Sequence, residues 1–133
     1  MSEDKKPTAK EKAREANKLK GIFESELPGY PGSFTLPSPF LDRHMRCWWD
    51  NAFILRKEQE LEATDYDYAE CEWKAYVALI TQHGSWDIEG VPVGDLDGGG
   101  MPMVVKAWVM GEALLYIVPF VPPNRLRGGF GNL

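Results

Sequence analysis

Two histidines and two cysteines, the side-chain types that zinc prefers, lie in the middle of the chain: His44, Cys47, Cys71 and His83. Zinc sites usually bring such ligands in compact Cys-x-x-Cys or His-x-x-x-His pairs. His44 and Cys47 are three residues apart and would share a helix face, but Cys71 and His83 are twelve apart. We therefore expect two packed thiols and two partly exposed imidazoles, with no metal and no cofactor.

A second candidate for metal chemistry precedes a run of three glycines. Asp95 and Asp97 there resemble the opening of a calcium-binding loop. The last position of that loop requires a bidentate glutamate, and counting from Asp95 places Lys106 there instead. The pattern therefore predicts a solvated loop rather than a calcium site.

Acidic residues also cluster at the start of a predicted helix: Asp65, Asp67, Glu70 and Glu72. Paired carboxylates can act as general acids and bases. The helix dipole alone, however, favours acids at a helix N-terminus. The chain contains no nucleophile elbow, phosphate-binding loop or dinucleotide-binding fingerprint. We therefore expect a protein that is not an enzyme.

The longest apolar segment, residues 101–118, is expected to form the helix around which the core is built. Pro102 is tolerated in a first helical turn and Pro119 ends the helix. Residues recur at the helical period as Val104, Val105, Trp108, Val109, Glu112, Leu115 and Tyr116. The length approaches the roughly 20 residues of a membrane span. Lys106 and Glu112 would each cost about 2.5–3.5 kcal/mol at a bilayer centre, so we expect no membrane span.

Two more helices are predicted before it, over residues 38–62 and 65–82. Ser38 and Pro39 are typical of an N-cap and a first helical residue. Residues at helical spacing share one face of each helix: Leu41, Met45, Trp48, Ala52 and Leu55 in the first, and Ala69, Trp73, Tyr76 and Ile80 in the second. Gly84 would be a left-handed C-cap. Residues 33–36 could form an edge strand, and residues 85–100 a long loop.

Length and composition favour one globular domain, since 44% of the 133 residues are hydrophobic and 26% are charged. The expected fold is mainly α: a small helical domain of three to four helices with extended proline-rich segments and a short edge strand. We expect a charged N-terminal arm or marginal helix over 1–22. The helical domain would follow over 23–123, and a flexible tail over 124–133.

Charge is unevenly distributed along the chain. Residues 1–20 carry seven Lys or Arg and four Asp or Glu, whereas the rest carries eight and sixteen. A basic arm could contact nucleic acid, but this one mixes both signs and has no aromatic residue to stack on bases. Nucleic-acid binding is therefore not expected. The charged N-terminus contains no apolar signal segment, which favours the cytoplasm and reduced cysteines.

Several short motifs occur in a suggestive order. PGSFTLPSPF, residues 31–40, is followed by a predicted helix with Trp48 and Trp49, then by WDIEGVP over residues 86–92. The last helix contains AWVMGE over residues 107–112. This order resembles that of small tail assembly chaperones of long-tailed bacteriophages, across roughly residues 28–118. The longer basic arm and the glycine-rich loop before the last helix depart from that pattern.

The resemblance implies a mainly helical, non-enzymatic protein of the host cytoplasm. Such chaperones bind the tape-measure protein, keep its apolar helices soluble and assist assembly of tail-tube subunits. On this interpretation, the exposed partner-binding surface consists of aromatic residues: Phe34, Phe40, Trp48, Trp49, Phe53 and Trp86. The alternative is a structural virion component, such as a head–tail connector or a tail-completion protein. The chain could also form homo-oligomers.

Overall fold

The computed structural model describes residue 6 and residues 8–52 and 65–121 of the chain. Within them are four α-helices, two 3₁₀ helices and one three-stranded antiparallel sheet. In chain order these are α1 Ala9–Lys18, β1 Ile22–Glu24, β2 Gly32–Thr35, α2 Asp42–Ala52, α4 Asp65–His83, β3 Ser85–Ile88, η2 Val93–Asp95, α5 Met103–Ile117 and η3 Val118–Phe120. The expectation of a small, mainly helical domain is thereby confirmed.

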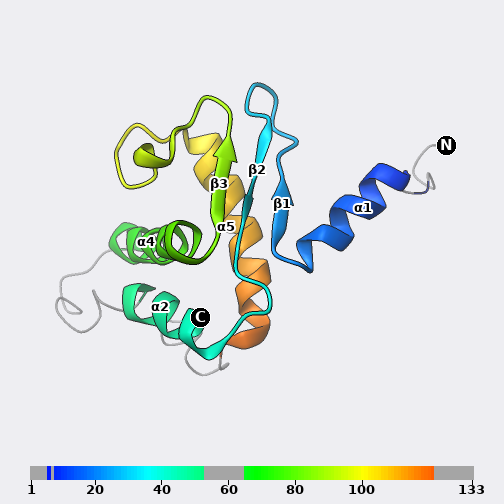
Figure 1. Cartoon of the computed structure of the whole chain (residues 1–133). Coiled ribbons are helices and arrows are strands. Elements are labelled where there is room, and N and C mark those ends of the chain that lie inside the picture. The colour runs from blue at the N-terminus through cyan, green and yellow to red at the C-terminus, as the bar shows by residue number, and fades with distance from the viewer. Residues whose placement is uncertain (1–5, 7, 53–64, 122–133) are drawn as a thin grey trace.

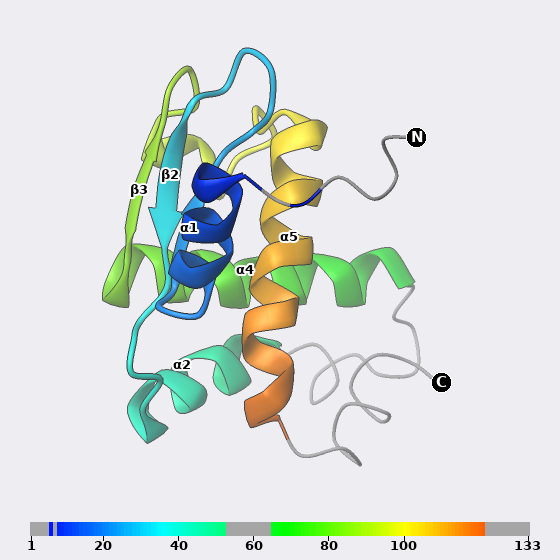
Figure 2. The same ribbon diagram turned by 90° about the vertical axis from the view of Figure 1, so that its right-hand side faces the viewer.

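Helix α5 runs along one face of the sheet, and α2 and α4 pack together across one end of it (Figure 1). The turned view shows that α4 crosses the direction of α5, while α1 lies on the β1 side of the sheet (Figure 2). The predicted central helix is therefore present, with Pro102 as its N-cap rather than a first-turn residue. The segment 103–120 is also long and apolar enough to cross a membrane, judged by length and composition alone.

The sheet presents aromatic side chains to α5. Phe34 on β2 is paired with Phe23 on β1 and with Trp86 on β3. Because side chains alternate along a strand, these three rings share one face. Phe34 stacks on Phe23 with ring centroids 4.8 Å apart, and Trp108 of α5 meets Phe34 edge-on at 5.2 Å. These contacts join the sheet to α5 in the hydrophobic core.

The predicted edge strand over residues 33–36 proves to be the central strand, β2. The error comes from residues 85–88, which were expected in a loop but form β3. A strand of four residues gives too short a polar–apolar alternation to stand out. Ile22 at the start of β1 also shows that the expected domain boundary after residue 22 falls inside a strand. Residues 124–133 lie outside the described part of the chain.

The helix predicted over residues 38–62, with Ser38 as N-cap and Pro39 as first helical residue, begins three residues later than expected, at Asp42. Its N-cap is Leu41, whose carbonyl accepts the first helical hydrogen bonds, and not Ser38, which precedes a cis peptide bond to Pro39. The Leu41 N–H donates to His44 Nδ1 at 2.9 Å. His44 thus supplies the N3 half of a capping box, a role usually taken by Glu or Gln. Residues 53–62 lie outside the described segments.

The helix predicted over residues 65–82 is confirmed as α4, but the structural role assigned to Gly84 was wrong. A left-handed conformation requires a positive φ angle. Gly84 is not among the glycines with a positive φ angle, so its backbone is not left-handed. A Cβ atom at Gly84 would lie 2.0 Å from the Thr35 carbonyl oxygen. Glycine is needed here because the end of α4 meets the backbone of β2.

Helix α1 begins with a capping box, in which Thr8 and Glu11 exchange side-chain-to-backbone hydrogen bonds. No residue of α1 is buried. Ion pairs join it to the domain: Arg14 lies 3.0 Å from Glu26, and Lys18 lies 2.9 Å from Glu112 of α5. The arm thus contains a helix that is attached to the domain mainly by charged side chains.

Candidate protein-binding surface

One side of α5 presents small and apolar residues to solvent. Their spacing of three or four residues places them in one line: Val104, Ala107, Gly111, Leu115 and Val118. Leu115 is 73% exposed and Val104 is 52% exposed. A Cβ atom at Gly111 would meet nothing within 4 Å, so the surface is open there. We call these five residues the α5 strip. A contiguous exposed apolar surface of this kind marks a binding site.

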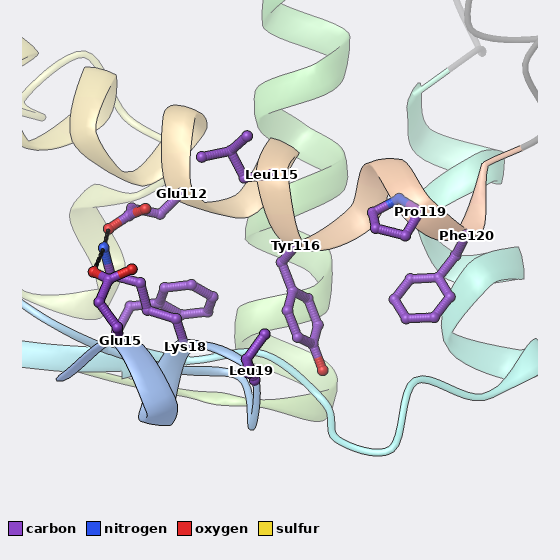
Figure 3. A pocket seen from close by; sticks show the side chains of 9 residues that line it. Glu15, Lys18, Leu19, Glu112, Leu115, Tyr116, Pro119 and Phe120 are labelled. Atoms are coloured by element: carbon purple, nitrogen blue, oxygen red, sulfur yellow. Dashed lines mark ion pairs between the residues drawn. The ribbon is translucent and has the colours of Figure 1, made fainter. Parts of the chain in front are cut away.

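At its C-terminal end the α5 strip borders a hollow between α1 and α5, which we call the α1–α5 groove (Figure 3). The groove has a volume of about 330 Å³. Its apolar lining consists of Leu19, Phe23, Leu115, Tyr116, Pro119 and Phe120. Leu115 belongs to both features, so the strip and the groove form one continuous surface.

Three charged side chains line the other end of the groove. The Lys18 ammonium lies 2.9 Å from a carboxylate oxygen of Glu15 and 2.9 Å from one of Glu112. The hydrogen bond that the Lys18 ammonium donates to the Glu112 carboxylate is the main cause that raises the pKa of Lys18; burial opposes it. One ammonium is therefore shared by two carboxylates, which leaves this end of the groove with an excess of negative charge.

Aromatic contacts support the apolar end of the groove. The Tyr116 hydroxyl donates a hydrogen bond of 2.7 Å to the Pro37 carbonyl oxygen. Phe40 stacks on Phe120 with ring centroids 5.0 Å apart and meets Tyr116 edge-on. The extended segment before α2 thus positions Tyr116, and Phe40 extends the apolar wall of the groove.

The six aromatic residues predicted to bind a partner do not form one surface. Phe34 and Trp48 have exposed fractions of 0%, so the expectation of an exposed position was wrong for both. Each completes the core, Phe34 beneath α5 and Trp48 near Tyr76 of α4. Large aromatics are the residues that fill a small core most effectively, which explains their position.

The other predicted residues are partly buried or lie outside the described segments. Trp86 is partly buried on β3, and its Nε1–H donates to the Val91 carbonyl oxygen at 2.7 Å. Trp49 is partly buried on α2, with its ring centroid 6.4 Å from that of Trp48. Phe40 does not line the α1–α5 groove itself but packs against Tyr116 and Phe120, which do. Phe53 lies outside the described residues.

Sequence reasoning placed the main residues of the α5 strip in the core. Val104 and Leu115 were included in the buried helical pattern, whereas the buried positions are Val105, Val109, Ala113 and Ile117. A helix that is apolar on two sides shows no clear period, so the pattern could not identify the packed side. Ala107 and Gly111, small residues one turn apart, were the available signal of a contact surface.

The side chains considered for metal binding are only partly brought together. The ring centroids of His44 and His83 lie 4.7 Å apart. The Cys47 thiol, a weak hydrogen-bond donor, lies 3.9 Å from the side-chain oxygen of Gln82. Burial raises the pKa of the Cys47 thiol. Within residues 8–52 and 65–121, no three His, Cys, Asp or Glu side chains are grouped so that they could hold a metal ion.

The acids near the start of α4 have structural contacts. Glu70 pairs with Lys106 of α5, and Lys106 also lies over the Trp73 ring. Glu72 accepts a hydrogen bond of 2.7 Å from the Tyr76 hydroxyl. Burial raises the pKa of Glu72, and the hydrogen bond from Tyr76 lowers it in part. These contacts connect residues within α4 and connect α4 to α5. The carboxylates of Glu70 and Glu72 are therefore both engaged and do not form a free pair.

Protein-family models, curated protein sequences and solved structures were each compared with this chain, and none of them matches it.

Proposed function

We propose that this chain is a non-enzymatic assembly chaperone that holds an apolar helix of its partner on the α5 strip. The observation that carries the proposal is the exposure of the strip on the helix that also forms the core. Ala107 and Gly111 would let a second helix approach the α5 backbone closely, and Val104 and Leu115 would pack beside it. Helix recognition by an apolar surface is a common binding mode.

The proposed partner is the tape-measure protein of a long-tailed bacteriophage, and the proposed process is assembly of tail-tube subunits around it in the host cytoplasm. The motif order over residues 28–118 supports this assignment through its resemblance to tail assembly chaperones. The α5 strip supports it because a chaperone of long apolar helices needs an apolar surface that stays soluble. The excess of acidic residues after residue 20 favours solubility.

The proposal is tested by co-expressing the tagged chain with the phage tail proteins and identifying by mass spectrometry what it captures. Val104→Asp and Leu115→Asp should each abolish capture of the tape-measure protein. Val93→Asp is the matched control, because Val93 on η2 is 53% exposed and Val104 is 52% exposed. Capture by the control variant should equal that of the wild type.

Two results would contradict this function. One is undiminished capture of the tape-measure protein by both strip variants, which would place the binding site elsewhere. The other is stoichiometric presence of the chain in purified phage particles, which would assign it to the virion as a connector or tail-completion protein. Circular dichroism of each variant shows whether the fold is retained.

A further inference from the structure

We infer that the α1–α5 groove selects partner helices in which a bulky apolar residue is followed, about one turn away, by a lysine or arginine. This inference rests on the proposed function, because it names the chemistry of the helix that the α5 strip would hold. Three features carry it: the volume of the groove, the separation of its apolar and charged ends, and the charge balance at the charged end.

The volume of the groove suits a large side chain. It is about 330 Å³, roughly twice the ~150 Å³ cavity that admits a benzene molecule. Phe23, Tyr116 and Phe120 supply aromatic walls, and Leu19, at 83% exposure, stands at the edge. A phenylalanine or leucine from a helix lying on the α5 strip would bury its side chain here, since Leu115 belongs to both surfaces.

The two ends of the groove differ in character, as Figure 3 shows. Glu15, Lys18 and Glu112 gather at one end, and Pro119 and Phe120 lie at the other. Residues three or four apart on a helix project from the same face. One face of a bound helix can therefore place an apolar residue in the hollow and a polar residue beside the carboxylates.

Charge determines which polar residue fits. Among the described residues, Lys18 is the one cation that lines the groove, and it is shared by Glu15 and Glu112. The Glu15 side chain is 71% exposed, so a partner can reach its carboxylate. A lysine or arginine would balance the excess negative charge, whereas a glutamate would face two carboxylates. The groove is thus complementary to a basic helix.

Two synthetic peptides of about 20 residues, long enough to form a helix, test the inference. Both are fluorescein-labelled amphipathic helices with leucines on one face and one phenylalanine; they differ only in a Lys or Glu four residues after the phenylalanine. Fluorescence anisotropy at low salt should show that the Lys peptide binds about fivefold more tightly than the Glu peptide. Glu15→Lys should reverse this preference, and Glu89→Lys, an exposed change outside the groove, should preserve it.

The failure of the inference can be separated from that of the proposed function. Equal affinity for both peptides, with binding abolished by Leu115→Asp, would overturn charge selection and leave helix docking intact. Failure to bind either peptide, together with loss of tape-measure capture in cells, would overturn both. A stable dimer in sedimentation that Leu115→Asp dissociates would assign the groove to a second copy and overturn the inference as well.

Discussion

The two sides of α5 are similar in composition but differ completely in environment. Val105, Val109, Ala113 and Ile117 face the core with exposed fractions of 0%, whereas Val104 and Leu115 are 52% and 73% exposed. The neighbours Val104 and Val105 show that residue type does not determine burial. The packing of the sheet and α4 onto one side of the helix does.

This difference indicates what each side is for. The buried side is sufficient to join the helix to the core, because burial of apolar area is what stabilises such a helix. The α5 strip adds nothing to that core, and an exposed apolar surface increases the risk of aggregation. An apolar surface of this kind is therefore better explained by binding than by folding.

The largest effect is expected from a pair of truncations on opposite sides of the helix. Ile117→Ala should lower the free energy of unfolding by about 2–5 kcal/mol, because it leaves a cavity in the core. Leu115→Ala should change it by no more than about 0.5 kcal/mol, because Leu115 is exposed. Urea denaturation measures both values. Equal losses would show that the strip is packed against another part of the chain.

A smaller effect of opposite sign is expected at Gly111. Gly111→Ala should raise the free energy of unfolding by about 0.5–1 kcal/mol, because glycine is unfavourable inside a helix and the site is open. The added methyl group should nevertheless weaken tape-measure capture by keeping the partner backbone away. Unchanged capture by a more stable variant would show that the partner does not approach α5 at this residue.

How much of this could be predicted from the sequence depends on the length of each periodic pattern. The helices over residues 65–83 and 103–117 have long patterns and were predicted within a few residues. The strand over residues 85–88 was missed because its four residues carry no lasting alternation. The late start of α2 was missed because His44, rather than the usual Glu or Gln, accepts the Leu41 N–H, and Leu41 is not a typical N-cap residue.

The candidate site was less predictable than the fold. A bulky aromatic residue suits a core and an interface equally well, so Phe34 and Trp48 were expected at the surface and lie in the core. The α1–α5 groove could not be predicted, because it requires α1 to lie beside α5, and residues 18 and 112 are distant in sequence. Of the predicted residues, Phe40 packs against Phe120 in the wall of the groove.

Acid should destabilise the start of α2, where His44 accepts a hydrogen bond from Leu41 and packs beside His83 of α4. Burial is the main cause that lowers the pKa of His44 below its ordinary value of 6.5; the positive charges of His83 and Arg43 lower it further. At pH values between the lowered pKa and 6.5, His44 binds a proton more readily in the unfolded chain than in the folded chain. The free energy of unfolding therefore falls as the pH decreases below about 6.5. Melting temperatures from pH 8 to pH 5 measure this.

The matched variant for this effect is His44→Gln. Glutamine at the N3 position can still accept the Leu41 N–H but cannot titrate. The decrease in melting temperature between pH 6.5 and pH 5 should therefore become smaller in the variant. An equal decrease in both proteins would assign the acid sensitivity to groups other than His44.

A small stability effect is expected where α1 joins α5, and the same substitution separates the two parts of the proposed surface. Lys18→Gln removes the ion pair to Glu112 and should cost about 0.2–1 kcal/mol, because the pair is only partly buried.

Hydrogen exchange should increase in α1 and stay unchanged in α5. Lys12→Gln, an exposed change on the same helix, should leave exchange unchanged in both helices. The substitution of Lys18 also removes the cation that Glu15 and Glu112 share, so the charged end of the groove becomes more negative. Tape-measure capture should persist because the strip is unchanged, and the preference for the Lys peptide over the Glu peptide should increase.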